Sequence, residues 1–144
     1  RIYPVGRLDM DSEGLLVLTN DGALTEHLTH PRHEVTKTYT ALVAGAPDDP
    51  TLRTLITGVD LDDGPAAARS ARIIDSHEGR SLVEVVMTEG RKREVRRMFE
   101  AVGHPVERLV RTGIGGLRDR DLKPGEWRHL TVDEVRALFD AGKP

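Results

Sequence analysis

The strand pattern around residues 80–88 constrains the fold most strongly. Its centre, Ser-Leu-Val-Glu-Val-Val-Met at 81–87, is rich in β-branched residues, and a second run at 67–75 precedes it across the turn-forming segment Ser76–Gly79. β-branched residues favour the pleated, half-buried surface of a sheet. Two such runs around a short polar turn predict a β-hairpin. We therefore expect an antiparallel pair of strands in the middle of the chain.

The other expected elements follow no regular alternation of strand and helix. We expect strands at 1–5, 15–19, 34–44, 59–61, 105–114 and 126–130, and helices at about 20–30, 49–57, 92–102 and from 131 onward. Thr131 and Glu134 form a capping box for the last helix. A regular βαβ order would indicate a parallel sheet, and none is present. The sequence predicts an α+β fold with a mixed, mainly antiparallel sheet flanked by helices.

Length and composition limit the class of protein. The chain has 144 residues, which suits one domain over 1–144. It has no cysteine, which excludes disulfides, thiolate metal sites and a cysteine nucleophile. No apolar run approaches the ~20 residues of a membrane span, and no signal peptide is recognisable. We expect a cytoplasmic protein. The first residue, Arg1, leads directly into a strand-like run, so we expect the chain to be part of a longer protein.

Charge is distributed unevenly along the chain. The net charge is −3, but residues 90–129 contain eleven Lys/Arg and six Asp/Glu. A basic patch on a weakly acidic body is what local phosphate binding requires. An ordinary solvated surface would have the same composition, so charge alone leaves both interpretations open.

Three acids follow the first expected strand: Asp9, Asp11 and Glu13, with Gly14 after them. The spacing imitates a calcium loop, but the twelfth position would be Asn20 instead of the bidentate glutamate. Asp-x-Asp after a strand is also typical of aspartate-based phosphotransferases, which use a doubly wound parallel sheet. A third possibility is one catalytic aspartate among solvated neighbours, and a fourth is an acidic turn without chemistry. A metal site at His30 and His33, three residues apart across a proline, would need carboxylates as well, so we expect these histidines to be surface or turn residues.

A basic run and a tyrosine are the other candidates. Arg93, Arg96 and Arg97 lie on one face of the expected helix, where guanidinium groups could bind phosphate or a carboxylate. Tyr39 lies in the middle of an expected strand, where it could stack on a nucleobase or simply pack in the core. A solvent-facing helix side would explain the arginines equally well.

Read together, these segments resemble a known family. The run VGRLDMDSEGLLVLTNDGAL at 5–24 looks like the signature of the ribosomal pseudouridine synthases. The similarity continues through His30-Pro31, Lys37-Thr38-Tyr39, the run from Glu89 to Met98, and Leu109-Val-Arg111. It covers nearly the whole chain, and the first motif is highly specific.

The resemblance implies a role for each candidate residue. Asp9 would be the catalytic aspartate, Arg7 its partner in the loop, and Tyr39 the ring that stacks on the target base. Arg96 would pair with Asp9 in the closed site, and Arg91 would hold RNA or shape the site. The partner would be ribosomal RNA, and the reaction would need no metal and no cofactor. Two positions differ from the family pattern, because Lys92 and Glu94 stand where Asn and Gln are often found.

The resemblance also implies segments that are not in residues 1–144. Family members usually carry a small N-terminal RNA-binding domain, and their catalytic domain begins with strands upstream of Arg1. The chain would then be a catalytic domain incomplete at its N-terminus. We expect a monomer whose sheet edge is open to pairing or swapping. Two other functions stay open: an RNA-binding module without activity, and an aspartate-based phosphotransferase that needs magnesium.

Overall fold

A five-stranded sheet forms the centre of the protein in the computed structural model, which describes all residues 1–144. Its strands, in spatial order, are β2 (Glu13–Gly14), β9 (Val106–Ile114), β4 (Lys37–Ala44), β8 (Arg80–Met87) and β7 (Ser70–His77). Only β2 and β9 run parallel; the other neighbouring pairs are antiparallel. This confirms the prediction of an α+β fold with a mixed, mainly antiparallel sheet.

The predicted hairpin is formed by β7 and β8. Ser70 is opposite Val86 at one end, and His77 is opposite Arg80 at the turn. The turn residues Glu78 and Gly79 both have positive φ, 50° and 76°, which suits a tight hairpin turn. Every second side chain of β8 from Ser81 to Met87 is buried, as expected for a strand with one face on the core.

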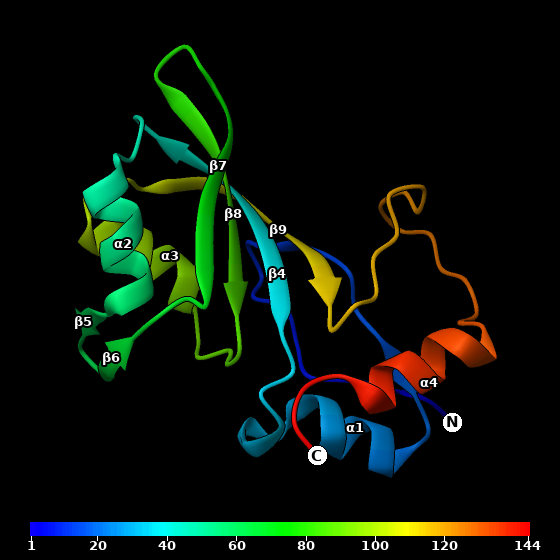
Figure 1. The fold of residues 1–144 in the computed structure, drawn as a ribbon. Helices are drawn as coiled ribbons and strands as arrows, with labels where there is room; N and C mark the ends of the chain where they lie inside the picture. The colour runs from blue at the N-terminus through cyan, green and yellow to red at the C-terminus, as the bar shows by residue number, and fades with distance from the viewer.

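Two helices, α2 (Asp49–Thr57) and α3 (Glu94–Ala101), lie on the same side of the sheet (Figure 1). The larger hydrophobic core includes residues from the sheet and both helices, among them Val83, Leu55 and Phe99. A short hairpin of β5 (Val59–Leu61) and β6 (Gly64–Ala66) follows α2. The side chain of Asp48 caps α2 by accepting from the N–H of Thr51 at 2.9 Å.

A second, smaller core lies at one end of the sheet. There α1 (Gly22–Thr29), the short 3₁₀ helix η1 (Pro31–His33) and α4 (Val132–Asp140) surround buried Leu24, Leu28 and Leu138. Both chain termini lie at this end (Figure 1). The capping box of Thr131 and Glu134 is present, as predicted. No helix in the protein combines the length and the apolar character needed to cross a membrane.

The buried strand expected at 15–19 is the main error of the sequence prediction. Only β3 (Leu18–Thr19) is a strand there, and it pairs with β1 (Tyr3–Pro4) outside the main sheet. Leu16 and Leu18 are 42% and 50% exposed. The chain leaves the main sheet after the N–H of Leu15 donates to the carbonyl of Arg111 at 2.9 Å, so residues 16–19 have no partner strand in that sheet.

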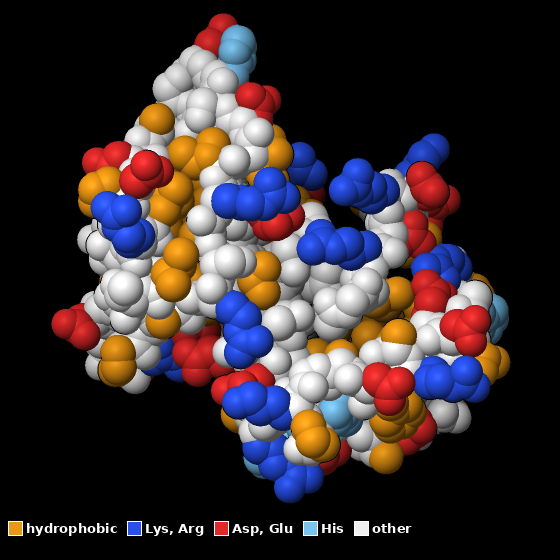
Figure 2. Space-filling view, viewed as in Figure 1, with side chains coloured by type: hydrophobic (Ala, Val, Ile, Leu, Met, Phe, Trp, Pro, Cys, Tyr) orange, Lys and Arg blue, Asp and Glu red, His pale blue; other side chains and the backbone are white.

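The basic segment 90–129 does not form one isolated patch. Figure 2 shows the Lys and Arg side chains of one face of the molecule spread out, with Asp and Glu side chains between them. Several arginines of this segment pair with carboxylates, as Arg97 does with Asp63 at 2.7 Å and Arg108 with Glu13 at 2.7 Å. Charge counting along the chain therefore overstated the free positive charge.

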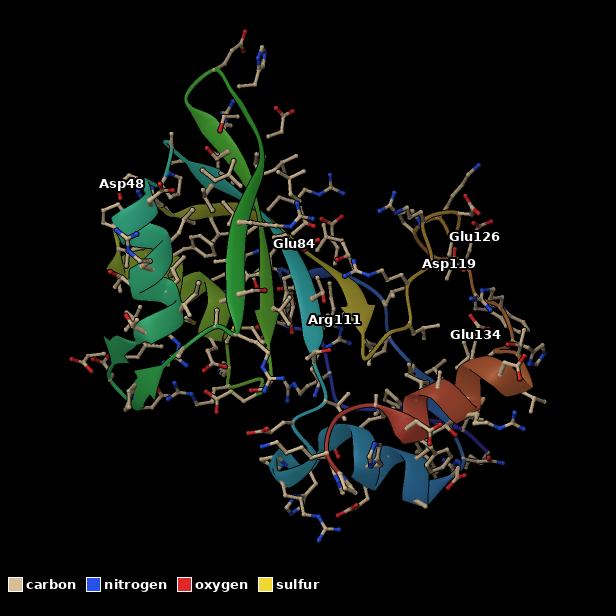
Figure 3. The ribbon with its side chains drawn as sticks, in the orientation of Figure 1. Asp48, Glu84, Arg111, Asp119, Glu126 and Glu134 are labelled. Carbon is tan, nitrogen blue, oxygen red and sulfur yellow. The ribbon has the colours of Figure 1, made fainter.

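The strand expected at 126–130 is also absent, and ion pairs hold that loop instead. Arg128 donates to Asp119 at 2.6 Å and to Glu134 at 2.7 and 2.8 Å. Asp119 and Glu126 lie in the loop between β9 and α4, and Glu134 lies in the first turn of α4 (Figure 3). Ion pairs between side chains hold residues 126–130, which make no hydrogen bonds to another strand. The pattern of apolar residues in the sequence could not reveal these ion pairs.

Candidate active site

A pocket of about 390 Å³ opens where the loop before β2 meets the sheet and the start of α3. Four of the five predicted site residues line it: Arg7, Asp9, Tyr39 and Arg91. They come from two segments that are widely separated in sequence and from β4 between them. The fifth, Arg96, is not part of the lining.

Asp9 lies in a tight turn that is docked on α3. The turn is closed by the N–H of Ser12, which donates to the carbonyl of Asp9 at 2.9 Å. Oδ2 of Asp9 accepts from the backbone N–H of Arg93 at 3.1 Å. Arg93 is the N-cap residue of α3 and has no side-chain cap of its own. The carboxylate thus occupies a place where helices bind anions, because free N–H groups and the helix dipole both favour negative charge.

Arg93 itself has an unusual backbone. Its φ of 52° and ψ of 30° are left-handed, a region that residues with a Cβ rarely adopt. The strand-to-helix connection turns at this residue, which directs its N–H toward Asp9. No sequence pattern predicted this, because the chain has arginine where a glycine would have been the signal.

Arg96 contacts Asp11 in this structure, and its pairing with Asp9 in the closed site stays a prediction. Its Nη2 donates to the carbonyl of Asp11 at 2.5 Å, and its Nε lies 3.4 Å from Oδ2 of Asp11. Arg96 forms no ion pair with Asp9. The reason is geometric: Asp11 faces the first turn of α3, where its carbonyl and its carboxylate lie next to the guanidinium of Arg96.

The three acids of the loop have separate partners. Asp11 pairs with Arg93 and Arg96, whereas Glu13 pairs with Arg108 at 2.7 Å. No group of three or more His, Asp or Glu side chains in the chain is arranged to hold a metal ion. The hydrogen bond from Arg93 comes first among the causes that hold the pKa of Asp11 below its usual range, and the charge of Arg96 lowers it further.

Two basic residues at the floor of the pocket were not predicted as site residues. Lys37 is half-buried, and its Nζ donates to the carbonyls of Leu28 and Val35, both at 3.0 Å. Burial and then the nearby Arg111 lower its pKa. Arg111 is buried, with two guanidinium nitrogens on the carbonyl of Leu15 at 2.9 and 2.8 Å. Figure 3 shows it on the part of the sheet nearest α1 and α4. The sequence signals that could have identified Lys37 and Arg111 were the family motifs Lys37-Thr38-Tyr39 and Leu109-Val-Arg111.

The position of Tyr39 is compatible with both expected roles, packing in the core and stacking on a nucleobase. Its half-buried side chain packs against the larger core and also lines the pocket. Its hydroxyl makes no hydrogen bond within the chain. Tyr39 would therefore contact a ligand mainly through the face of its aromatic ring.

Arg91 is held in place by several contacts. Its guanidinium donates to Asp63 and to the carbonyl of Pro65 in the β5–β6 hairpin, at 3.0 and 2.9 Å, and its Nε donates to Glu94 at 3.0 Å. Glu94 is 3% exposed. Burial, a hydrogen bond with Glu89 and the charge of Glu89 outweigh Arg91 and raise the pKa of Glu94 to about 7. This edge of the pocket is a rigid, charged network.

The lining as a whole is positively charged, although the chain is acidic. Its six basic residues outnumber its three acids; the basic ones are Arg7, Lys37, Arg91, Lys92, Arg93 and Arg111, and the acids are Asp9, Glu89 and Glu94. Arg7 and Lys92 make no ion pair within the chain. A cavity of this size and charge suits a small anionic ligand or one nucleotide of a longer strand.

Comparison with known protein families identifies the family to which this chain belongs. A model of the family described as RNA pseudouridylate synthase matches residues 1–101. The chain belongs to this family. The match contains the turn of Asp9, Tyr39 and all of the basic run before β9.

Similar members of the RNA pseudouridylate synthase family include two that are named for the large ribosomal subunit. The chain is 47% identical to ribosomal large subunit pseudouridine synthase B of Bacillus subtilis, over 99% of the chain and 61% of the relative. It is 43% identical to ribosomal large subunit pseudouridine synthase E of Xanthomonas campestris, over 98% of the chain and 82% of the relative. A crystal structure of a pseudouridylate synthase superposes with a TM-score of 0.84 at 33% identity, covering 95% of the chain and 59% of that protein. The chain spans 54–61% of the length of several curated relatives that it matches.

Proposed function

We propose that this protein isomerises uridine to pseudouridine in ribosomal RNA, with Asp9 as the catalytic carboxylate and without a cofactor. The single observation that carries the proposal is the position of Asp9. Asp9 lines a basic pocket of about 390 Å³ together with the exposed Arg7 and with Tyr39. The names of the relatives from Bacillus subtilis and Xanthomonas campestris supply the substrate class.

The reaction makes clear demands on such a site. The bond between C1′ of the ribose and N1 of uracil breaks, the base turns, and C1′ bonds to C5. The proton lost from C5 is matched by one gained at N1, so the product is an isomer. A carboxylate can act as a nucleophile toward the sugar or the base, or as a base that removes a ribose proton. All three routes use the carboxylate of Asp9, whose Oδ2 accepts from the backbone N–H of Arg93.

The other residues would bind and orient the nucleotide. The target base would leave its stack to reach Asp9, and Tyr39 would stack on it. Arg7, without an internal partner, would hold a phosphate next to the target. Arg91 would act mainly by shaping the pocket, because its donors are committed to Glu94 and to the β5–β6 hairpin. Arg96 would act indirectly, by holding the loop that carries Asp9.

The domain assignment and the cellular setting belong to the same proposal. Residues 1–144 would form the catalytic domain, and the longer relatives would have further segments beside it. The domain would act as a monomer in the cytoplasm, where its RNA substrate is found. Size-exclusion chromatography with light scattering would test the oligomeric state.

The proposal is tested by tritium release from ribosomal RNA transcripts labelled at C5 of uridine. Bonding of C5 to C1′ expels that hydrogen, so release should increase with time and stop when one site per transcript has reacted. A chelator should leave the release unchanged. RNA binding without release would support a binding module instead, and release that survives the chelator would exclude a phosphotransferase that needs magnesium.

A further inference from the structure

We propose that Asp11 is a positioning residue, which clamps the turn of Asp9 onto α3 and so holds the catalytic carboxylate against the N–H of Arg93. The inference deepens the proposed function, since it assumes that Asp9 is the reactive group. It assigns a role to an acid that is two residues from the catalytic one and outside the pocket lining.

The clamp consists of Arg93, the N-cap residue of α3, and Arg96 within α3, which bind the side chain and the backbone carbonyl of Asp11. The side chain of Asp11 accepts from the guanidinium of Arg93, and its backbone carbonyl accepts from Nη2 of Arg96 at 2.5 Å. Arg93 therefore contacts both acids of the turn, Asp9 through its N–H and Asp11 through its side chain. A single residue thus fixes the spacing of the two carboxylates.

The turn transmits this restraint to Asp9. The hydrogen bond from Ser12 to the carbonyl of Asp9 closes residues 9–12 into one unit. A unit this small cannot shift at Asp11 without moving Asp9 as well. Because Asp9 itself is held to α3 by one hydrogen bond of 3.1 Å, the contacts of Asp11 supply most of the docking.

Arg96 explains why the charge of Asp11 matters. Arg96 is only 9% exposed, and its Nε has no hydrogen-bond partner. Nη1 donates to the carbonyl of Val106 at 3.3 Å, which fixes the group to β9. Asp11 is the one carboxylate within 4.0 Å of this guanidinium. Loss of that charge would leave a buried cation unpaired, which is costly and favours displacement of the turn.

The test compares Asp11→Asn with Glu13→Gln, a matched loss of one acid from the same loop. Glu13 pairs with exposed Arg108 and contacts neither Asp9 nor α3. In the free protein, amide exchange at Arg93 should be at least about 10-fold faster in Asp11→Asn, because its N–H loses a fixed acceptor. Glu13→Gln should exchange like the parent chain. Equal protection of Arg93 in all three proteins would overturn the proposal.

Kinetics on ribosomal RNA separate positioning from a general loss of stability. Asp11→Asn should lower kcat by roughly 10- to 100-fold with KM nearly unchanged, as expected for a reactive group that is slightly misplaced. Asp11→Glu, which keeps the charge, should recover part of the loss. A parent-like kcat in Asp11→Asn would contradict the clamp. If the parent chain released no tritium, the proposed function would fail, and the exchange experiment would still decide whether Asp11 positions Asp9.

Discussion

The backbone N–H of Arg93 donates to the carboxylate of Asp9 across 84 residues of sequence, at 3.1 Å. The left-handed conformation of Arg93, with φ at 52°, makes this contact possible. The start of α3 thus binds the candidate catalytic group through its backbone, while the arginine side chains bind the neighbouring Asp11.

The left-handed backbone of Arg93 predicts that glycine is more stable than alanine at this position, the reverse of the order inside a helix. At a left-handed position Ala is strained and Gly is not, so Arg93→Ala should be about 1 kcal/mol less stable than Arg93→Gly. Arg97 lies inside α3, where Gly is worse than Ala by a similar amount. Urea unfolding of the four variants should therefore show opposite orders at the two positions. The same order at both would mean that Arg93 is not left-handed in solution.

Tyr39 should act through its ring. Its hydroxyl has no partner, so Tyr39→Phe should keep kcat/KM within about 3-fold, whereas Tyr39→Leu should lose roughly 10- to 100-fold with the stacking contact. Leucine keeps most of the apolar contact with the core and limits the effect on stability. Steady-state tritium release measures both variants. Equal losses in Phe and Leu would assign the role to the hydroxyl.

Glu94 should make stability depend on pH near neutrality. Its pKa in the folded chain is about 7, above the ordinary 4.5, so the folded state binds this proton more tightly than the unfolded state. Its contribution is complete below about pH 4.5 and is lost as the pH rises through 7, with a slope of at most about 1.4 kcal/mol per pH unit. Glu94→Gln removes the titration.

The measurement is the free energy of unfolding of the parent chain and of Glu94→Gln at pH 5, 6, 7 and 8. The parent chain should lose stability relative to the variant across this series. Glu100→Gln, an exposed site on the same helix, is the control and should follow the parent chain. Parallel curves for the parent chain and Glu94→Gln would contradict a raised pKa.

Gly14 should tolerate no side chain. Its φ is 119°, and a Cβ there would overlap the backbone of Arg111 in β9. Gly14→Ala should cost about 3 kcal/mol or more, because backbone strain adds to the broken pairing of β2 with β9. Gly116→Ala, with open space and no left-handed φ, should be nearly neutral. Thermal unfolding compares the two, and a stable Gly14→Ala would refute the β2–β9 register.

The sequence predicted elements whose signals are local. The β7–β8 hairpin and the capping box of Thr131 follow from patterns within a few residues, and both are present. The strand expected at 15–19 failed because burial depends on partners elsewhere in the sheet. The family motifs identified residues that gather around one pocket, such as Asp9 and Tyr39.

Contacts between distant segments could not be predicted in the same way. Whether Arg96 reaches Asp9 or Asp11 depends on how a turn sits on a helix 85 residues away. The docking of Arg91 on the β5–β6 hairpin likewise depends on where that hairpin lies. Residue types specify what such groups can bind, and only the fold specifies which partner is nearest.

The most direct test of the central claim is tritium release by Asp9→Asn. The asparagine keeps the shape of the side chain and an oxygen for the N–H of Arg93, but it removes the charge. We expect no release above background, with RNA affinity within about 3-fold of the parent chain, since the phosphate contacts stay intact. Asp21→Asn, at the cap of α1, should be fully active because asparagine caps helices as well as aspartate does. Measurable turnover by Asp9→Asn would contradict the account.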